Sequence, residues 1–144
     1  GGKLILDGVR AKVSNNCGST WQGITVLGDP TQPQTEQYQG VVELKNGATI
    51  ENAIIGIHAP YGSTAHCGTP TNGGGIIKVD GANFVNCQTA IKIEPYQNFF
   101  NNELLPSASY ITNSSFQTNA SVYDASLTPQ NFIDLNIYLD NCVS

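Results

Sequence analysis

The sequence predicts an all-β chain that winds as a parallel β-helix, a solenoid of about four coils with three strands in each coil. A short phrase recurs at residues 6–11, 44–50 and 79–84, and more loosely at 111–116: an apolar strand ends at an Asp, Asn, Gly or Ser corner, and a second strand follows. Self-similarity at intervals of a few tens of residues is typical of solenoids. Short apolar segments between frequent corners favour strands over helices.

Three short apolar segments alternate with corners within each coil. The expected strands are residues 3–6, 9–13 and 22–26; 41–44, 49–51 and 54–57; 76–79, 83–85 and 90–93; and 109–111, 115–117 and 121–123. Such coils stack through parallel ladders. Residues 27–40, 58–75, 94–108 and 124–131 lie between the third strand of one coil and the first strand of the next. These inserts are therefore expected along one edge.

Equivalent positions of successive coils are expected to stack. The predicted inward rows consist of Ile50, Phe84 and Phe116, and of Ile57 and Ile93. Asn52 and Asn86 follow the second strand of their coils, where stacked asparagines can hydrogen-bond from coil to coil and satisfy backbone groups at a bend. Both asparagines are predicted to form a structural corner stack.

Charge and composition exclude two classes of partner. The chain has 6 Lys and Arg against 11 Asp and Glu, with a net charge of −5 at pH 7, whereas a nucleic-acid binder needs a basic stripe. No apolar run approaches the roughly 18 residues that span a bilayer, so no membrane insertion is expected. Only 12% of the residues are charged, and the rest of the surface is rich in Asn, Gly and Thr. This balance favours an extracellular or cell-surface location, where cysteines can be oxidised.

The chain is expected to form a single β-helix domain over residues 1–144. Residues 138–144 repeat the pattern of 110–116 but end without an apolar residue like Phe116, which predicts a coil that is incomplete at the C-terminal end. Neither end shows the polar capping element with which a solenoid normally closes. The expectation is a fragment of a longer protein, or a module that stacks on neighbouring coils or subunits.

One phrase carries a family resemblance. The pattern Cys-x-x-x-Trp-x-Gly-Ile at residues 17–24, followed by the segments 39–44, 46–53 and 81–87, resembles right-handed parallel β-helix repeats in large secreted and surface proteins of Bacteroidota. The resemblance covers nearly the whole chain and implies a right-handed helix in a secreted parent, of the kind exported by the type IX pathway. It transfers no catalytic residue to any position, because a fold alone does not supply function.

Right-handed β-helices also include pectate lyases and polygalacturonases, so the acids need weighing as catalytic groups. A glycoside hydrolase of the usual kind holds two carboxylates about 5–10 Å apart. Asp7 and Asp80 occupy equivalent corners, but the coil between them offers a Lys-Asn pair there, and Asp-Gly is ordinary turn chemistry. Lys92 and Glu94 lie on the same outer side of a strand by alternation, as a solvated ion pair does. No catalytic residue is predicted.

The histidines and cysteines suggest two kinds of site. His58, His66 and Cys67 are zinc-ligand types, but their spacing is irregular and a fourth ligand is not evident, so no metal or cofactor is predicted. Two alternatives are open for the cysteines: a disulfide that includes Cys67, with Cys87 as its possible partner, or unpaired thiols packed as small hydrophobes. Cys142 is expected to stand unpaired.

Aromatic residues on the inserts are the predicted contact surface for a ligand. They are Tyr38, Tyr61, Tyr96, Phe99, Phe100 and Phe132. Several lie beside amide-rich stretches, and aromatic faces with a few polar neighbours suit a small-molecule site such as one for sugar rings. The interpretation favoured over a ligand surface is that the inserts fold back and use these aromatics as anchors of a satellite core. Trp21 is expected to pack in the first coil rather than to bind sugar.

The favoured functional hypothesis is therefore a non-catalytic, extracellular β-helix segment of an adhesin-like or structural surface protein. Its coils would form a rigid scaffold that presents the inserts, and its partners would be other coils or domains of a longer parent, or neighbouring subunits. The alternative is a carbohydrate-active enzyme or carbohydrate-binding module that uses the insert edge to contact an extracellular polysaccharide. An enzyme should place two carboxylates together and perturb the pKa of one.

Overall fold

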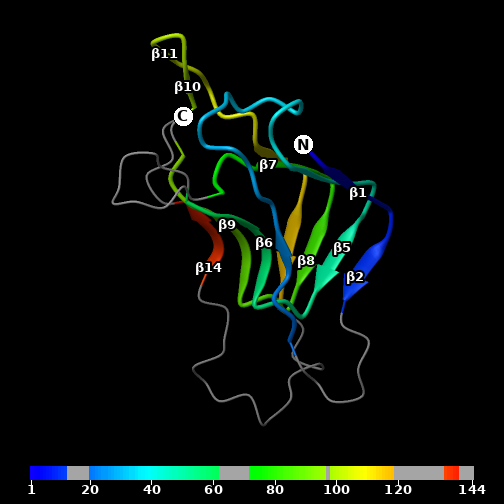
Figure 1. Ribbon diagram of the computed structural model, residues 1–144. Coiled ribbons are helices and arrows are strands. Elements are labelled where there is room, and N and C mark those ends of the chain that lie inside the picture. The colour runs from blue at the N-terminus through cyan, green and yellow to red at the C-terminus, as the bar shows by residue number, and fades with distance from the viewer. Residues whose placement is uncertain (13–19, 62–71, 97, 119–134, 140–144) are drawn as a thin grey trace.

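The computed structural model describes residues 1–12, 20–61, 72–96, 98–118 and 135–139. These residues form strands, turns and irregular segments, with no helix among them. Most of the strands belong to three parallel sheets of four strands each, which the chain visits in turn. In Figure 1, β2, β5 and β8 lie side by side and point the same way, while β6, β9 and β14 form a neighbouring wall.

Each sheet takes one strand from every round of the chain. The first sheet contains β1 (Lys3–Asp7), β4 (Val41–Lys45), β7 (Ile76–Asp80) and β12 (Tyr110–Thr112). The second contains β2 (Arg10–Lys12), β5 (Thr49–Glu51), β8 (Asn83–Val85) and β13 (Ser115–Gln117). The third contains β3 (Ile24–Thr25), β6 (Ile55–Ala59), β9 (Thr89–Ile93) and β14 (Leu135–Leu139). The three strands of one round are called a rung, so that the first rung is β1–β3 and the fourth is β12–β14.

The corner between the first and second strands of a rung explains the recurring sequence phrase. Its first residue adopts the left-handed backbone conformation in every rung: the φ angles are 62° at Gly8, 53° at Asn46, 68° at Gly81 and 50° at Asn113. Glycine reaches this region without steric cost, and asparagine is the next most tolerant residue. The alternation of Gly and Asn at this position is therefore a backbone requirement.

The core lies between the three sheets. In β4 the alternation buries Val42 and Leu44 and leaves Glu43 and Lys45 half-exposed on the outer face, as expected for a strand that has one face on a core. Equivalent residues stack from rung to rung, as Ala11, Ile50, Phe84 and Phe116 do in the second sheet. The predicted row through the second strands is thus confirmed.

The inner row of the third sheet differs from the prediction by one inward-facing position, which is two residues along the strand. Ile57 lies opposite Ile91, and Ile93 lies opposite Ala59. Expecting Ile57 and Ile93 in one row was therefore wrong. β6 extends to Ala59, past its predicted end at residue 57, so that two inward positions per strand are available, and the pairing register decides which of them meet.

The predicted strands agree with the structure to within a few residues, apart from the last segment of the chain. Residues 135–139 form β14, which pairs with β9 through Ile137 opposite Ile91 and Tyr138 opposite Lys92. The predicted equivalence of 138–144 with the first strand 110–112 is therefore wrong for the described residues 138 and 139. The apolar and polar alternation of this segment matches that of β9, and the pairing sets the half-buried Ile137 against Ile91. The expected strand 121–123 lies outside the described residues.

One hairpin is absent from the sequence-based prediction. β10 (Phe99–Phe100) and β11 (Glu103–Leu104) pair antiparallel, and the hairpin projects beyond the sheets at the top of Figure 1. Asn101 and Asn102 connect the strands with φ angles of 50° and 62°. Two central residues with positive φ are the requirement of a type I′ turn, whose twist suits a two-residue hairpin.

Candidate functional site

The insert of residues 27–40 folds back on itself around one buried amide. The side chain of Gln39 is fully buried; its Oε1 accepts the N–H of Asp29 at 2.6 Å, and its Nε2 donates to the carbonyl oxygen of Asp29 at 2.9 Å. The same Nε2 also lies 3.1 Å from the carbonyl oxygens of Gln32 and Pro33. One glutamine thus satisfies backbone groups that a loop without regular structure would leave open.

A second buried amide pair joins this insert to the later one. Asn98 Oδ1 accepts the N–H of Gln34 at 2.9 Å, while Asn98 Nδ2 donates to the carbonyl oxygen of Pro106 at 2.8 Å. Gln34 Oε1 in turn accepts the N–H of Ala108 at 2.8 Å. The amide-rich stretches that suggested a sugar site therefore serve to hold the inserts together.

The predicted ligand-contact aromatics differ in burial and in role. Tyr96 donates its hydroxyl to the carbonyl oxygen of Gln32 at 2.5 Å and acts as an anchor between inserts. Tyr38 and Phe100 are 43% and 44% exposed, and Tyr61 is half-buried. Phe99 belongs to β10, and the structure describes only its backbone. The alternative in which inserts fold back is borne out for Tyr96, although amides rather than aromatics supply most of the anchoring.

Trp21 has the packing role expected of it. Its indole N–H donates to the carbonyl oxygen of Glu51 at 2.8 Å, and its backbone bridges to Ala53 of the next rung. The ring packs against the buried core cluster. It is therefore a partly buried packing residue with its polar group satisfied.

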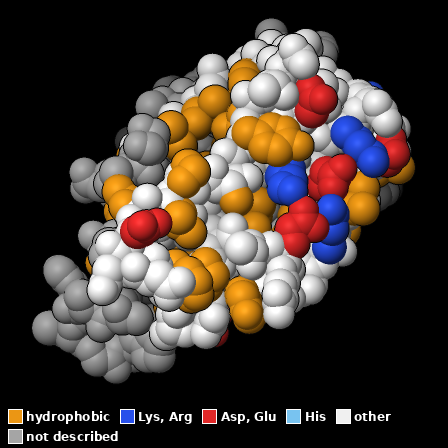
Figure 2. Space-filling view, turned by 90° about the horizontal axis from the view of Figure 1, so that it is seen from above, with side chains coloured by type: hydrophobic (Ala, Val, Ile, Leu, Met, Phe, Trp, Pro, Cys, Tyr) orange, Lys and Arg blue, Asp and Glu red, His pale blue; other side chains and the backbone are white. Residues whose placement is uncertain are grey.

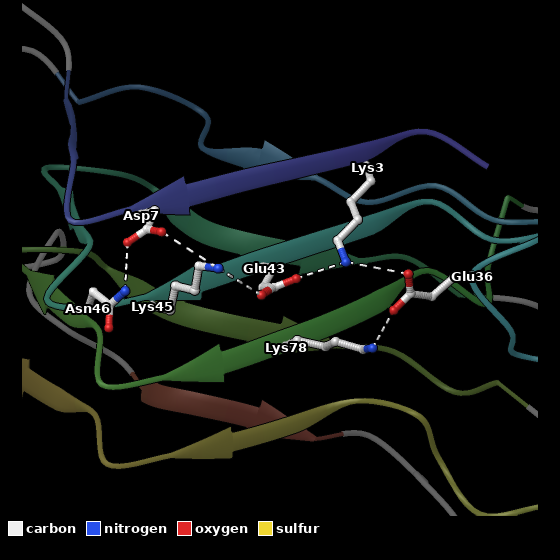
Figure 3. A network of polar contacts seen from close by, with 7 residues as sticks. All are labelled: Lys3, Asp7, Glu36, Glu43, Lys45, Asn46 and Lys78. Carbon is white, nitrogen blue, oxygen red and sulfur yellow. Dashed lines mark hydrogen bonds and ion pairs between the residues drawn. The ribbon is translucent and has the colours of Figure 1, made fainter.

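The outer face of the first sheet carries a network of charged side chains (Figure 3). Lys3 Nζ lies 2.8 Å from Glu43 Oε2 and 3.4 Å from Glu36 Oε2, and Glu36 also pairs with Lys78. Lys45 Nζ lies 3.6 Å from Glu43 Oε1 on the same strand and 3.6 Å from Asp7 Oδ2 on β1, so it links the network back to the first strand. In Figure 2, positive and negative side chains gather on one part of the face seen from above, with hydrophobic side chains on another.

The carboxylates of this network have the wrong electrostatics for acid catalysis. A hydrogen bond from Lys78, and then one from Lys3, holds the pKa of Glu36 below its usual range. The hydrogen bond from Lys3 does the same for the pKa of Glu43 and outweighs desolvation. A glycosidase-type general acid needs a raised pKa so that it carries a proton near neutral pH. Glu36 and Glu43 instead stay ionised beside their lysines.

The corner acids Asp7 and Asp80 accept hydrogen bonds from the corner of the following rung. Asn46 Nδ2 donates to Asp7 Oδ1 at 2.7 Å, and Asn113 Nδ2 donates to Asp80 Oδ1 at 2.8 Å. Hydrogen bonds from Asn113 and then Thr112 lower the pKa of Asp80. Asp7 and Asp80 are the last residues of β1 and β7, directly before the left-handed corner glycines, and their side chains link one corner to the next.

The outer face of the third sheet holds a row of titratable side chains. His58 lies opposite Lys92, and Lys92 lies opposite Tyr138. Lys92 Nζ is 2.5 Å from Glu94 Oε1 and 5.6 Å from the centroid of the Tyr138 ring. The sequence predicted the Lys92–Glu94 pair, but not that His58 and Tyr138 would join it, because the join depends on the register between rungs.

Glu94 has a structural task in this row. Its Oε2 accepts the N–H of Tyr61 at 2.8 Å and lies 3.6 Å from His58 Nε2. Desolvation raises the pKa of Glu94, but the hydrogen bonds from Lys92 and from the backbone of Tyr61 outweigh it, and the net shift is downward. The carboxylate thus ties the start of an insert to the sheet.

Cys87 is a free thiol in the core. Its side chain is 3% exposed, and its Sγ lies 3.7 Å from the carbonyl oxygens of Ile50 and Val85. Desolvation raises the pKa of the thiol. Of the two alternatives for the cysteines, Cys87 follows the second, a small hydrophobe in the core; its possible disulfide partner Cys67 lies outside the described residues. No group of three metal-ligating side chains occurs within the described ranges, and His66 falls outside them.

Asn52 and Asn86 lie at the corner that follows the second strand of a rung, and their backbone conformation explains why asparagine is found there. Asn52 and Asn86 have φ angles of 58° and 53°. The N–H of Asn52 donates to the carbonyl oxygen of Val85 at 2.9 Å, and that of Asn86 donates to Gln117 at the same distance. The left-handed conformation explains why asparagine stands there; hydrogen bonding between stacked side chains stays a prediction.

Comparison of the chain with protein-family models, with curated proteins and with solved structures gives no match. In the part of the chain that the structure describes, no helix has the length and apolar character that a membrane span requires. The function proposed below therefore rests on the residues and their geometry.

Proposed function

We propose that this chain is a segment of a right-handed parallel β-helix, and that it serves as a non-catalytic extracellular scaffold in an adhesin-like or structural surface protein. Three parallel sheets that the chain visits in turn are compatible with a parallel β-solenoid. Crossover connections between parallel strands of one sheet are right-handed in about 98% of cases, which supports the proposed hand. Its partners are then adjoining coils or domains, or neighbouring subunits.

The observation that carries the non-catalytic reading concerns the carboxyl groups. Every described carboxyl group whose pKa departs clearly from its ordinary value is shifted downward; the group comprises Asp29, Glu36, Glu43, Asp80 and Glu94. An enzyme that cleaves a glycosidic bond with two carboxyl groups needs one of them raised. Donors on neighbouring strands, corners or inserts hold these acids ionised, so that the acids tie the structure together.

A catalytic screen tests the proposal directly. The purified chain would be incubated with neutral and acidic polysaccharides, and the release of reducing ends and of unsaturated uronides would be followed. We expect no turnover, and immunolabelling of intact cells of the source organism should reveal the chain at the surface. Turnover that disappears when Glu43 is replaced by Gln would overturn the scaffold proposal. The matched control is Glu103→Gln, which changes an exposed acid on the hairpin β10–β11.

A carbohydrate-binding module is the second candidate, and exposed aromatics favour it. Tyr38 and Phe100 expose 43% and 44% of their surface on the inserts, and aromatic faces can hold a sugar ring. Titration calorimetry with the same polysaccharides, on the wild-type chain and on Tyr38→Ala and Phe100→Ala, distinguishes the candidates. Micromolar binding that either substitution weakens at least tenfold favours the module, whereas absence of binding leaves the scaffold.

A further inference from the structure

The first and fourth rungs form two open edges of the same molecule. All three sheets run from a first-rung strand to a fourth-rung strand: β1 to β12, β2 to β13, and β3 to β14. Among the described residues, no further strand pairs with either edge, so each edge presents three parallel strands with one side unpaired within that part of the chain. Such edges are templates for pairing with another chain.

Apolar side chains at both edges are exposed where their row mates are buried. Leu4 is 44% exposed, although Val42 and Ile77 at the same register position are 1% and 0% exposed. Leu139 is 58% exposed, whereas Ile93 beside it is half-buried and Ala59, the next residue in the row, is 3% exposed. A neighbouring rung makes the difference in each row, because the residues in the middle rungs are covered on both sides.

The backbone at the two edges is complementary. One hydrogen bond recurs between successive second strands: Thr49 N–H to Val9 O at 2.9 Å, Asn83 N–H to Ala48 O at 2.8 Å, and Ser115 N–H to Ala82 O at 2.9 Å. The N–H and C=O of a trans peptide point in opposite directions.

The N–H of Arg10 therefore points away from the second rung, because the carbonyl of Val9 in the same peptide points toward it. By the same reasoning the carbonyl of Ser114 points away from the third rung. Arg10 N–H and Ser114 C=O are the donor and acceptor that a fourth copy of this bond would need. They lie on opposite edges, so one copy cannot join its own pair, whereas two copies arranged head to tail can.

The side chains also fit. With the register of the inner rungs continued, Phe116 of one copy would meet the small Ala11 of the next, and Tyr110 would meet Ile5. Tyr110 and Ile5 are 46% and 48% exposed, so their contact would cover apolar surface on both sides.

Charge does not oppose this contact. Asp7 and Arg10 on the first-rung edge would face Thr112 and Ser115, which are neutral. No like charges directly oppose one another at these positions, an arrangement that would otherwise destabilise paired strands.

We propose that two copies of this chain associate head to tail, with the fourth rung of one copy pairing in parallel with the first rung of the next. This inference rests on the proposed scaffold function and names its partner. The contact is heterologous and does not close, so further copies extend it into a filament. Twofold pairing of like edges and pairing with a different protein are the competing outcomes of the test.

Two Leu→Lys substitutions block one edge each. Leu4→Lys blocks the first-rung edge and Leu139→Lys the fourth, because the exposed positions let the ammonium reach water in the free chain, whereas stacking would bury it without a partner. Leu104→Lys is the matched control: Leu104 is 52% exposed and lies on β11 of the projecting hairpin. Should Leu4→Lys fail to fold, Ile5→Pro replaces it, since the N–H of Ile5 points away from β4 and its loss is tolerated at an edge.

Sedimentation velocity from about 1 to 100 μM, a range that spans micromolar affinities, gives the readout. The wild-type chain and Leu104→Lys should form concentration-dependent oligomers, whereas Leu4→Lys and Leu139→Lys should each be monomeric, with association weakened at least tenfold. Mixing the two blocked variants should restore a 1:1 dimer and nothing larger, since each retains one open edge.

Other outcomes separate this inference from the proposed function. A folded wild-type chain that stays monomeric throughout overturns head-to-tail association but leaves the scaffold proposal standing. If one blocked variant alone still dimerises, like edges pair with one another, and the head-to-tail arrangement is wrong. If all variants associate as the wild type does, or only a different protein binds the edge, the proposed contact is likewise excluded. Polysaccharide turnover would remove the scaffold proposal without affecting the sedimentation result.

Discussion

Replacing Phe84 with Ala tests whether the inner row of the second sheet holds the rungs together. Phe84 is 1% exposed and lies between Ile50 and Phe116 in its row. Its ring stacks on that of Phe116 with centroids 5.3 Å apart and an interplanar angle of 10°. Phe116 belongs to the fourth rung and is only partly buried. The two phenylalanines therefore differ in burial while sharing one contact.

The expected cost follows from this difference. Removing a fully buried Phe side chain lowers the free energy of unfolding by about 3–5 kcal/mol, through lost apolar burial and the cavity that remains. Phe116→Ala should cost roughly half as much, because less apolar surface is buried around it. The stacked pair should add a coupling of about 0.5–1.5 kcal/mol in a double-mutant cycle. Since a domain of this size is stable by about 5–15 kcal/mol, the Phe84 variant is measurable but strongly weakened.

Urea unfolding followed by the fluorescence of Trp21, the single tryptophan of the chain, provides the assay. Measurements at low micromolar concentration keep self-association from adding to the stability of the edge rung. Equal losses for Phe84→Ala and Phe116→Ala, or a coupling indistinguishable from zero, would refute the stacked row. If Phe84→Ala does not fold, Phe84→Leu should still lose about 1–2 kcal/mol, as a smaller apolar side chain leaves a smaller cavity.

Three further predictions concern the insert, the buried thiol and one corner. Gln39→Leu should lower the free energy of unfolding by about 2–4 kcal/mol, because buried backbone groups lose their partners; a urea midpoint equal to that of the wild type would exclude the anchoring role. The peptide containing Cys87 should resist thiol labelling in the native chain, since the thiol is buried and its pKa is raised; prompt labelling, read by mass spectrometry, would contradict this burial. Because the pKa of Asp80 lies below its ordinary 3.8, its hydrogen bonds stabilise the fold above that pH, and the stabilisation is lost as the pH falls through the lowered pKa. Asn113→Gly, which removes the side-chain amide but tolerates the left-handed backbone at this corner, should therefore lower Tm near neutral pH and leave it nearly unchanged once Asp80 is protonated, and a Tm difference that persists in acid would count against the pairing.

The corners were predictable because their chemistry is local. A left-handed residue is required at Asn46, Gly81 and Asn113, and only a few residue types tolerate it. The hairpin at Asn101 and Asn102 obeys the same rule and carried a local signal that the prediction overlooked: two adjacent asparagines directly after two phenylalanines. These features depend on a few neighbouring residues, and sequence alone suffices to find them.

The amide anchors and the polar rows depend on residues far apart in the chain. Gln34 meets Ala108, and Asn98 meets Gln34, only after the sheets have set the two inserts side by side. His58, Lys92 and Tyr138 share a row because the third-sheet strands pair in one register rather than another. A shift of one residue would place these side chains on the opposite face, and nothing in the local sequence excludes it.

The sequence by itself determined most of the strands, the corners between them and the structural role of Asp7 and Asp80, because backbone sterics and apolar alternation act over a few residues. Only the tertiary structure decided where residues 135–139 pair, how the inserts are anchored, and which charged groups meet. Those outcomes depend on register and on contacts between rungs, which are set by burial summed over whole strands. The carboxylates that were weighed as catalytic groups therefore serve as structural contacts between neighbouring parts of the chain.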